Sequence, residues 1–558
     1  MARHRPPRGK NAAGKALRLL LAAGAITTAA LLAALAGPRD PEVTVVRIQL
    51  IDAESGKPTP AMVCISDTRD GTVRVPPDGR ANPEPNTTVE FRRGVPFSRG
   101  KEWVGPVRKT TGKGNNDDRS FVYGRLPSLP YWSDPVMYQT PSEFTIRLPE
   151  GRWRISVQHG MEYIPVSQEF PTSGATLEKT IRLARWIDLP SEGWFSGDVH
   201  VHHPTTEQSH RDYLLEYAKA EDVHLVNILE QHHHSGSHSK QWGFGKKFRV
   251  ERDGRWLISG QEAPSSTFGH IIGLNVDRLV HDPENVDLYD LAFRGIHENR
   301  EALVGYAHFS WNGCDLPRGF PWYVTTEEID FVELKQFAKI NAPDYHDYLN
   351  LGFRLTAAAG SDLPWGSTMG EVRTFVYTGD TFDPDRWFAA LKAGRTFVSN
   401  GPALELTVDG ELPGTTLRKV RDTNARIRVR VRSHAKIGLV RTLKVMSNEG
   451  VLNEIKPQGT KTELAMDFEA PLPRSRWIVA SAECSNGALA HTSPVYVLVD
   501  SKPAWCPERG PEIIDKQLDA IGQIEKEFAS RNAAILTRLK RAREYYSKLE
   551  AAMKNERE

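Results

Sequence analysis

Strand-like and helix-like segments alternate between residues 191 and about 400, and this alternation limits the possible folds more than any other feature of the chain. Apolar, β-branched runs predict strands at residues 222–229, 256–259, 270–276, 303–309, 331–334, 356–360 and 372–377. Apolar residues at helical spacing predict helices at residues 205–220, 286–301, 345–355 and 383–392. Thr205 and Asp383 are the predicted caps of the first and last helices. Repeated β–α alternation over this length predicts a parallel sheet, open or closed into a barrel.

Histidine and acidic residues follow these predicted strands at the points where the strands end. Of the 18 histidines in the chain, 13 lie between His200 and His308. The residues at strand ends are His200, His202, His232, Glu262, His308 and Asp362, and His270 begins a strand after a tight loop. In a closed barrel such positions meet at one rim. Because so many polar groups would be costly to gather there without a compensating cation, the pattern predicts a metal cluster.

The stretch Gly197-Asp-Val-His-Val-His202 follows Trp194-Phe-Ser196 and predicts the end of a buried strand. Side chains alternate along a strand, so His200 and His202 should point the same way, and Asp198 should share their face. Two imidazoles side by side on a rigid strand can hold one ion.

The combined motifs resemble the polymerase-and-histidinol-phosphatase (PHP) superfamily of metal-dependent hydrolases, and more narrowly its CehA/McbA branch. The resemblance covers about residues 140 to 405 and includes His-x-His at His200, Gly360-Ser-Asp362 and the run from Ala393 to Pro402. It implies a distorted seven-stranded β/α barrel with two or three divalent cations, commonly zinc, manganese or iron. The expected fold class is therefore α/β, a PHP-type barrel flanked by β-sandwiches and a C-terminal helical segment.

The resemblance also implies an arrangement of ligands. One ion would be held by His200, His202, Glu262 and Asp362, and Glu262 would share a second ion with His270 and His308. His232 would belong to a third position. Two departures fall at that position, because Gln231 stands where the family has Asp and Pro364 where it has His. Possible replacements are Glu207, His233, His234 and His238, whereas His210, His224, His281 and His297 lie outside the motifs.

The predicted mechanism follows from a Glu262 bridge between two cations. The ions would lower the pKa of a shared water, so that hydroxide becomes the nucleophile, and would stabilise charge on the attacked oxygen. Asp198 is expected to orient a ligand imidazole. Arg395 is a candidate for holding a substrate anion, with a surface ion pair as the alternative, and Lys335 is a weaker candidate.

The predicted activity is cleavage of a phosphoester in a small-molecule substrate. Alternatives are ester, amide or carbamate hydrolysis at the same site, or a non-catalytic binding protein on a degenerate barrel. Net charge is +2, so composition offers no electrostatic case for binding nucleic acid.

Short strands separated by turns predict a β-sandwich on each side of the barrel. The N-terminal one spans residues 43–189 and contains a long insertion rich in Gly, Pro and Asn, the barrel spans 191–402, and the C-terminal sandwich spans 403–500. Residues 511–558 have apolar residues at helical spacing. They predict a long helix or a helical hairpin that packs on the body or on a second copy, or a solvated terminal helix. Cys484 and Cys506 could pair or remain free thiols.

Residues 1–37 predict export. Basic residues from Arg3 to Arg18 precede an apolar run that ends at Gly37, and Ala34-Leu-Ala36 offers a cleavage site. The run also has about the length of a membrane anchor. A cleaved signal peptide is favoured over an anchor. Either one places the rest of the chain outside the cytosol, in the periplasm, in the extracellular space or on the outer side of a membrane.

Overall fold

The computed structural model describes residues 43–69, 73–74, 138–233, 236–265, 268–309, 319–336, 339–363, 368–459, 461–528 and 532–557. The predicted signal segment and most of the predicted insertion lie outside these ranges. Within them, no helix combines the length and the apolar character that crossing a membrane requires.

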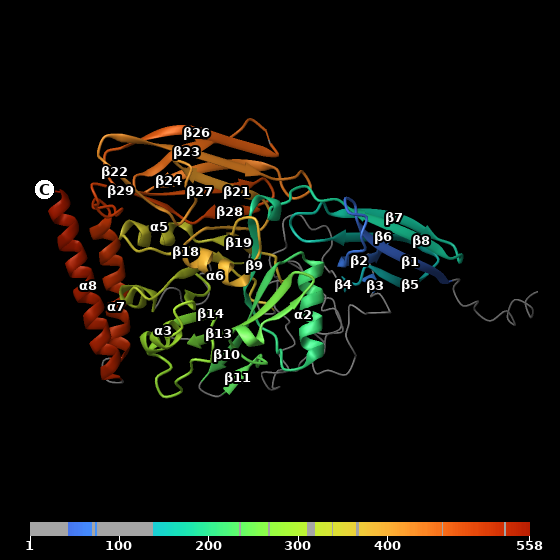
Figure 1. Ribbon diagram of the computed structural model, residues 1–558, viewed down its shortest axis with the longest axis horizontal. Helices are drawn as coiled ribbons and strands as arrows, with labels where there is room; N and C mark the ends of the chain where they lie inside the picture. The colour runs from blue at the N-terminus through green and yellow to red at the C-terminus, as the bar shows by residue number, and fades with distance from the viewer. Residues whose placement is uncertain are drawn as a thin grey trace, which may run out of the picture.

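Two sheets form the N-terminal part of the described chain, at the right of Figure 1. One sheet contains β5 (Glu143–Pro149), β1 (Val43–Asp52) and β8 (Leu177–Leu183). The other contains β3 (Val73–Arg74), β2 (Ala61–Asp67), β4 (Tyr138–Thr140), β6 (Gly151–Gln158) and β7 (Val166–Thr172). One buried cluster joins side chains of both sheets, including Ile48 of β1 and Ile155 of β6. The sheets therefore pack face to face, as in a β-sandwich.

Strand pairing in the central part follows a path that returns to its starting strand. The path runs through β9 (Trp194–Val201), β10 (Leu225–His233), β13 (Arg255–Ser265), β14 (Gly269–Leu274), β15 (Leu303–Tyr306), β16 (Phe331–Gln336) and β18 (Thr356–Ala359). Beyond β18, Asp362 N–H donates to His200 O at 2.7 Å and His202 N–H donates to Leu363 O at 2.6 Å. These two bonds tie the last strand to the first.

Each strand on this path contributes to one buried apolar cluster, which includes Val199, Leu229, Ile258, Ile272, Leu303, Phe331 and Ala358. Helix α6 (Pro384–Lys392) adds Trp387 to the same cluster, and the indole N–H donates to Phe195 O at 3.1 Å. Gly197 makes room for it, because a Cβ there would overlap the Trp387 ring.

The prediction of an all-parallel sheet is wrong at two strands. β14 is antiparallel to both of its neighbours, and β19 (Arg373–Tyr377) is antiparallel to β9 and to β20 (Thr396–Ser399). Three residues separate β13 from β14, and a parallel crossover needs about a dozen or more. The same reversal places His270, at the start of β14, opposite Pro264 near the end of β13.

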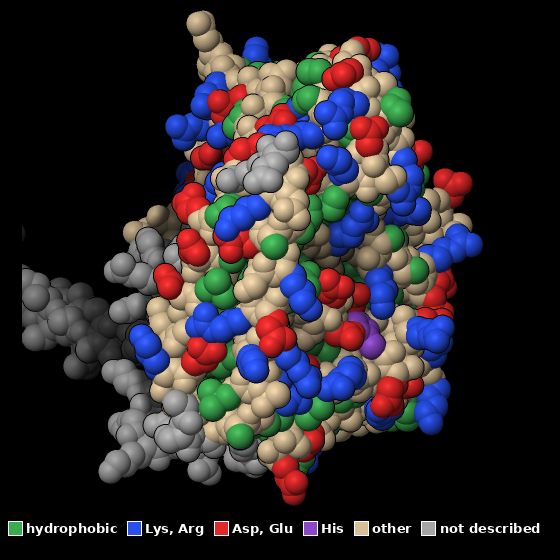
Figure 2. Space-filling view, turned by 90° about the vertical axis from the view of Figure 1, so that its left-hand side faces the viewer, with side chains coloured by type: hydrophobic (Ala, Val, Ile, Leu, Met, Phe, Trp, Pro, Cys, Tyr) green, Lys and Arg blue, Asp and Glu red, His purple; other side chains and the backbone are tan. Residues whose placement is uncertain are grey.

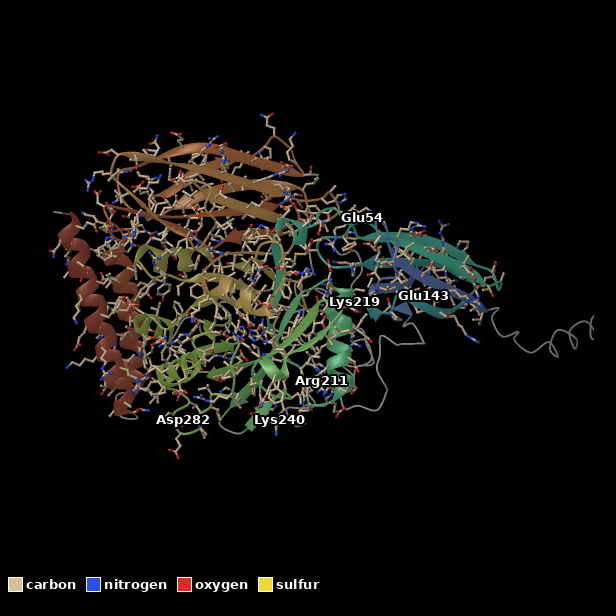
Figure 3. The ribbon with its side chains drawn as sticks, viewed as in Figure 1. Glu54, Glu143, Arg211, Lys219, Lys240 and Asp282 are labelled. Atoms are coloured by element: carbon tan, nitrogen blue, oxygen red, sulfur yellow. The ribbon has the colours of Figure 1, made fainter. Side chains whose placement is uncertain are left out.

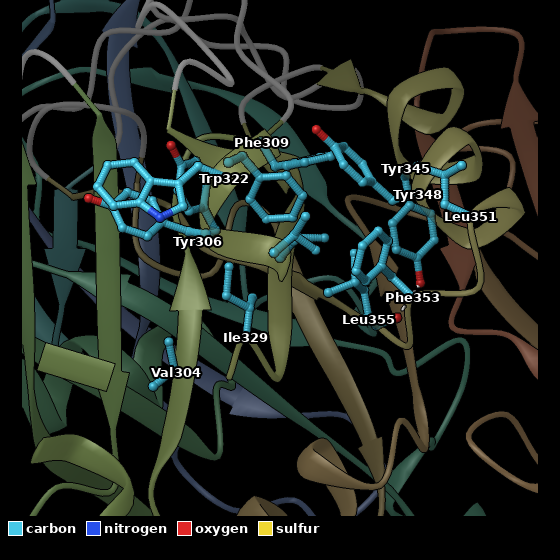
Figure 4. Close-up of a cluster of buried hydrophobic side chains, with 14 of the residues drawn as sticks. Val304, Tyr306, Phe309, Trp322, Ile329, Tyr345, Tyr348, Leu351, Phe353 and Leu355 are labelled. Carbon is cyan, nitrogen blue, oxygen red and sulfur yellow. Dashed lines mark hydrogen bonds between the residues drawn. The ribbon is translucent and has the colours of Figure 1, made fainter. Parts of the chain in front are cut away.

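Helices pack around the central strands. They are α2 (Gln208–Ala220), α3 (Tyr289–His297), α4 (Phe320–Tyr323), α5 (Ala342–Asn350) and α6. Asp383 caps α6 as predicted, since its side chain accepts from Arg386 N–H. The predicted Thr205 cap of α2 is wrong, because Glu207 is the cap and forms a capping box with His210. Figure 4 shows aromatic side chains of α4, α5 and the adjoining strands in their shared core.

A second pair of sheets forms the C-terminal part, at the top of Figure 1. One contains β21 (Ala403–Val408), β23 (Thr423–Arg432) and β26 (Glu463–Leu472). The other contains β22 (Thr416–Lys419), β24 (Val440–Ser447), β25 (Gly450–Ile455), β27 (Arg476–Cys484), β28 (Leu489–Thr492) and β29 (Val495–Val499). β28 pairs with β20, which joins this sheet to the central strands. Cys484 and Cys506 are free thiols, so they do not form the disulfide that the sequence left open.

The C-terminal segment folds into two helices, α7 (Gly510–Phe528) and α8 (Ala533–Arg557), which lie at the left of Figure 1. Their apolar residues, including Ile521 and Leu539, join the core under α4 and α5. Tyr546 Oη donates to Pro321 O at 2.7 Å, and Tyr348 Oη donates to Gln517 Oε1 at 2.7 Å. The apolar stripe is therefore buried within the same chain. Figure 2 shows basic and acidic side chains intermixed over the face that these helices form.

Candidate metal centre

A bulge in β9 decides which of its polar side chains lie together. Val226 pairs with Asp198 and Ile228 pairs with Val201, so β9 has one residue more than β10 over this span. An extra residue interrupts the alternation of faces. The imidazoles of His200 and His202 lie together, whereas the carboxylate of Asp198 faces backbone N–H groups that include those of Ser361 and Gly370.

Asp198 is bonded to backbone rather than to a ligand imidazole, which corrects the predicted role. Its carboxylate accepts the N–H groups of His200 at 3.1 Å, Ser361 at 3.0 Å and Gly370 at 2.9 Å. Burial raises the pKa of Asp198 to about 6 although these three N–H groups oppose the shift. Asp198 thus ties the segment around Asp362 to β9.

The Nε2 atoms of His200 and His202 lie 2.9 Å apart, and both side chains are buried. Each ring is oriented by an acceptor at its other nitrogen. His200 Nδ1 lies 2.9 Å from Glu333 Oε1, and His202 Nδ1 lies 3.0 Å from the carbonyl oxygen of Leu229. A carbonyl oxygen only accepts, so His202 Nδ1 carries the proton and, in the neutral ring, Nε2 presents a lone pair.

Two carboxylates lie close to the same pair of imidazole nitrogens. Glu262 Oε1 lies 3.4 Å from His200 Nε2, and Glu262 Oε2 lies 3.3 Å from His202 Nε2. Asp362 Oδ1 lies 3.4 Å from His200 Nε2 and 3.6 Å from His202 Nε2. Asp362 has a positive φ of 54°, a conformation that an L-residue adopts rarely.

His308 and His270 complete the cluster on the other side of Glu262. His308 Nε2 lies 3.5 Å from Glu262 Oε1 and 3.0 Å from His270 Nδ1. His270 Nδ1 lies 2.8 Å from the same Glu262 oxygen. The described residues thus include two groups whose ligand atoms lie within 4.8 Å of one another and could hold a cation, namely His200, Glu262 and His308, and His200, His202 and Asp362.

The buried carboxylates of this cluster need a compensating positive charge, which a cation or protons on the imidazoles can supply. Burial lowers the pKa of His200, but the carboxylates of Glu333, Asp362 and Glu262 outweigh burial and raise it well above its ordinary value. The same balance raises the pKa of His308 to about 9. Burial raises the pKa of Glu262, yet the imidazoles of His270 and His200 hold it well below its usual range. Binding of a cation would release those protons.

Three supporting side chains were missed by the sequence reasoning. Glu333 and Gln336 lie on β16 and bond to His200 and His308, the latter through Gln336 Oε1 at 2.8 Å from His308 Nδ1. Gln231 Nε2 donates to Glu262 Oε2 at 2.8 Å. The signal that could have found Glu333 is a carboxylate inside an otherwise apolar predicted strand.

His232 belongs to neither of these two groups, and its predicted place at a third position stays a prediction. Its neighbour Gln231 has the position that reaches Glu262, and alternation along β10 turns His232 elsewhere. The ring of His232 lies against His281, with centroids 4.4 Å apart. Among the suggested replacements, Glu207 caps α2 and His238 pairs with Gln231 across β11 (Gly236–His238). The side chain of His233 and the whole of His234 lie outside the described residues.

The predicted anion-binding role of Arg395 is also corrected. Tyr377 N–H donates to Arg395 O at 3.0 Å, and Tyr377 pairs with Trp194 at the start of β9. β19 and β20 are antiparallel, so Arg395 lies beside Tyr377 and therefore near Trp194. This is the opposite end of β9 from His200, about 20 Å along the strand. Lys335 is fully buried on β16, where desolvation lowers its pKa to about 7 despite Glu371.

Scans of protein-family models and of curated proteins find no match for this chain. Among solved structures, it is similar to PsfC from Pseudomonas syringae PB-5123, with 17% identity and a TM-score of 0.23 over 36% of this chain and 88% of that one. It is similar to the lesion-specific endonuclease PfuEndoQ from Pyrococcus furiosus, with 15% identity and a TM-score of 0.24 over 36% and 55% of the two chains. A third is Endonuclease Q in complex with a 27-mer duplex that has an abasic lesion at the active site, with 13% identity and a TM-score of 0.21 over 36% and 56%. TM-scores this low carry no argument about the function of this chain.

Proposed function

We propose that this protein is a metal-dependent hydrolase of the PHP type that cleaves a phosphoester in a small-molecule substrate. The support comes from two imidazole nitrogens, His200 Nε2 and His202 Nε2, which face each other at 2.9 Å beside two carboxylates. Both rings are oriented through Nδ1, so their Nε2 lone pairs would repel unless a positive charge lay between them. A divalent cation fits this donor set of imidazoles and carboxylates.

We assign the residues to two positions. His200, His202 and Asp362 would hold one cation, and Glu262 would bridge it to a second held by His308 and His270. When bound, the cations would supply Lewis acidity and an activated water. Zinc, manganese and iron all suit these ligands. A third ion is not part of the proposal, because neither group of potential ligands among the described residues includes Gln231 or His232.

The protein residues have separate tasks in this proposal. Glu333 and the carbonyl of Leu229 keep the rings of His200 and His202 oriented, which lowers the ordering cost of ligation. Asp198 holds the Asp362 segment in register with β9. The closed path of seven strands is proposed as the distorted PHP barrel, with Glu262 at its rim.

The test combines metal content with a substrate panel. Purified protein loaded with zinc, manganese or iron should hydrolyse a p-nitrophenyl phosphomonoester or phosphodiester, lose the activity in a chelator and regain it on reloading. His202→Ala and Asp362→Ala should abolish activity while circular dichroism stays unchanged. Arg395→Gln, at the far end of β9, should retain activity.

Each competing outcome has a distinct meaning. Turnover of p-nitrophenyl acetate alone would favour an ester or amide hydrolase at the same site. A folded chain that binds no metal and turns over no substrate would favour a binding protein. A DNA oligonucleotide belongs in the panel because the expectation of no nucleic-acid partner rests on net charge. Full activity in a metal-free preparation would overturn the proposal.

Export stays a prediction from residues 1–37, which lie outside the described residues. We propose that the mature protein acts outside the cytosol, as a cleaved or membrane-anchored form. N-terminal sequencing of the protein isolated from cell fractions would decide between these forms. A homo-oligomer through α7 and α8 is not proposed, because the apolar stripe of those helices is buried against their own chain.

A further inference from the structure

The two proposed cation positions differ in their access to solvent. We call the position formed by His200, His202 and Asp362 the inner position, and the position formed by His308 and His270 the outer position. The side chains of His200 and His202 are fully buried, and that of Asp362 is 10% exposed. In the outer position the side chain of His308 is 4% exposed, but that of His270 is 23% exposed. Solvent therefore reaches the outer position through His270.

His270 lies at the rim where β10 and β13 end. It pairs with Pro264 near the end of β13, and β10 runs parallel to β13. Lys240 and Asp282, labelled in Figure 3, lie on the edge of the molecule where β10 and β11 end. The exposed ligand is thus on the side of the central strands where these strands end, rather than inside their apolar core.

The imidazole rings also differ in how they are oriented. An acceptor outside the cluster bonds to Nδ1 of His200, of His202 and of His308, and leaves Nε2 of each ring directed toward the carboxylates. His270 instead directs Nδ1 into the cluster, 2.8 Å from Glu262 Oε1. In the described part of the chain, both hydrogen-bond contacts of the His270 ring involve this Nδ1. A ring that no outer acceptor orients must be ordered when a cation binds, which lowers the affinity.

The carboxylates are divided unequally between the two positions. The inner position has Asp362 and shares Glu262, whereas the outer position has its share of Glu262 alone. Attraction between a cation and a carboxylate is strong in a buried site and weaker where water raises the effective dielectric constant. Two cations that share one carboxylate also repel each other, so the ion that binds second meets the charge of the first. Both effects weaken binding at the outer position.

We propose that the inner position binds one divalent cation tightly, and that the outer position binds a second, exchangeable cation about tenfold or more weakly because His270 is exposed and has no outer acceptor. This inference rests on the proposed function. The proposed chemistry uses both positions, so hydrolysis depends on the free concentration of the cation. Occupancy of the outer position thus switches the activity on and off.

The test is a calorimetric titration of the metal-stripped, full-length chain with Mn²⁺. The wild type should show two steps whose affinities differ about tenfold or more. His270→Ala should weaken the weaker step about tenfold or abolish it, and should change the tight step by less than about twofold. His202→Ala should instead weaken the tight step. His434→Ala removes a partly exposed histidine from the C-terminal sheets and is the matched control, which should leave both steps unchanged.

Retention of metal gives a second measurement that needs no fitted isotherm. Passage of the manganese-loaded wild type through a desalting column in metal-free buffer should remove the outer ion and keep the inner one. Elemental analysis should then find about one manganese per chain, half of the loaded content. Hydrolysis of p-nitrophenyl phosphate should be lost on the column and should return when Mn²⁺ is added.

The inference and the proposed function fail in different ways. Equal affinities in the two steps, a single cation per chain, or a weak step that His270→Ala leaves unchanged would each overturn the inference. Loss of both steps together in His270→Ala would also overturn it, because the inner position would then depend on the exposed ring. A folded wild-type chain that binds no cation would refute the proposed function itself. Two equally tight steps with intact hydrolysis would refute the unequal positions alone.

Discussion

One carboxylate, that of Glu333, serves two of the proposed metal ligands. Its Oε1 lies 2.9 Å from His200 Nδ1, and its Oε2 accepts the backbone N–H of His308 at 2.9 Å. His308 has a positive φ of 58°, so this bond also holds a rarely adopted backbone conformation. The orientation of one ligand ring and the backbone of another therefore depend on a residue that would not touch the ions.

Glu333→Gln is expected to weaken metal binding. The two groups that face Glu333 are both donors, and a glutamine has only one oxygen to offer them, so its NH₂ would confront the other donor. Loss of such a supporting bond lowers metal affinity about 10- to 100-fold. Competition titration with a chromophoric chelator measures the metal affinity of the variant and of the wild type. Glu216→Gln, on the exposed face of α2, is the control, and equal affinities in the two variants would contradict the role of Glu333.

Gly360→Ala is expected to damage the same contact. A Cβ at Gly360 would overlap both Glu333 Oε1 and His200 Cβ, which are buried and cannot withdraw. Overpacking of this kind costs about 1–3 kcal/mol of stability. The loss should appear in urea unfolding of the metal-free protein, together with weaker metal binding. Gly151→Ala is the matched control, since its Cβ would meet the Arg69 side chain at an ordinary 3.4 Å. A Gly360 variant as stable as that control would refute the packing argument.

The pair His346 and His491 should make stability fall in acid. Their Nε2 atoms lie 3.1 Å apart between α5 and β28, and burial lowers the pKa of His346 to about 3 and that of His491 to about 4. In the unfolded chain both titrate near 6.5, so below that pH the unfolded state binds more protons. The contribution of the two neutral rings to the free energy of unfolding is thus complete above about pH 6.5 and is lost as the pH falls toward 4. At pH 5 each ring accounts for about 2 kcal/mol.

Other groups also titrate in this range, so the measurement is a difference between variants. Urea unfolding of wild type and of His346→Gln is compared at pH 7.5 and pH 5. The wild type should lose more stability over this interval than the variant, because the variant lacks one of the two proton acceptors. Parallel losses in both proteins would show that the pair does not titrate as described.

Arg185→Ala is expected to loosen the junction between the N-terminal sheets and the central strands. Arg185 Nη1 lies 2.8 Å from Glu162 Oε2, and Nη2 lies 2.9 Å from Asp222 Oδ2. Burial already raises the pKa of Glu162 to about 7, and without Arg185 this carboxylate would be a buried, unpaired acid. Removing one partner of a buried pair costs about 3–5 kcal/mol. Thermal unfolding measures the loss, with Arg47→Ala in an exposed pair as the control. If both variants melted alike, the buried pair would not stabilise the junction.

Much of the candidate site could be read from the sequence because its ligands sit in short local patterns. His200 and His202 are two residues apart on one strand, and Glu262, His308 and Asp362 each follow an apolar run. Such signals need only strand periodicity and the rule that strand ends meet at one rim. Placement of the capping residue Asp383 also needed only local chemistry.

The errors concern features that depend on tertiary pairing. One extra residue in β9, visible only against β10, interrupts the alternation that the sequence predicted for Asp198 and His200. The antiparallel pairing of β19 with β9 and with β20 joins segments that are far apart in sequence, and it places Arg395 at the opposite end of β9 from His200. Glu333 is 133 residues from His200 in sequence, so no local pattern could join them. A single sequence thus indicates ligands more readily than the groups that orient them.

The most direct test of the account is the number of divalent cations that one folded chain binds. Purified protein, stripped and then reloaded with zinc or manganese, is analysed by equilibrium dialysis and elemental analysis. We predict two cations per chain in the wild type and a clear loss in His202→Ala and Asp362→Ala, with all three proteins folded by circular dichroism. A folded wild-type chain that binds no cation would contradict the account.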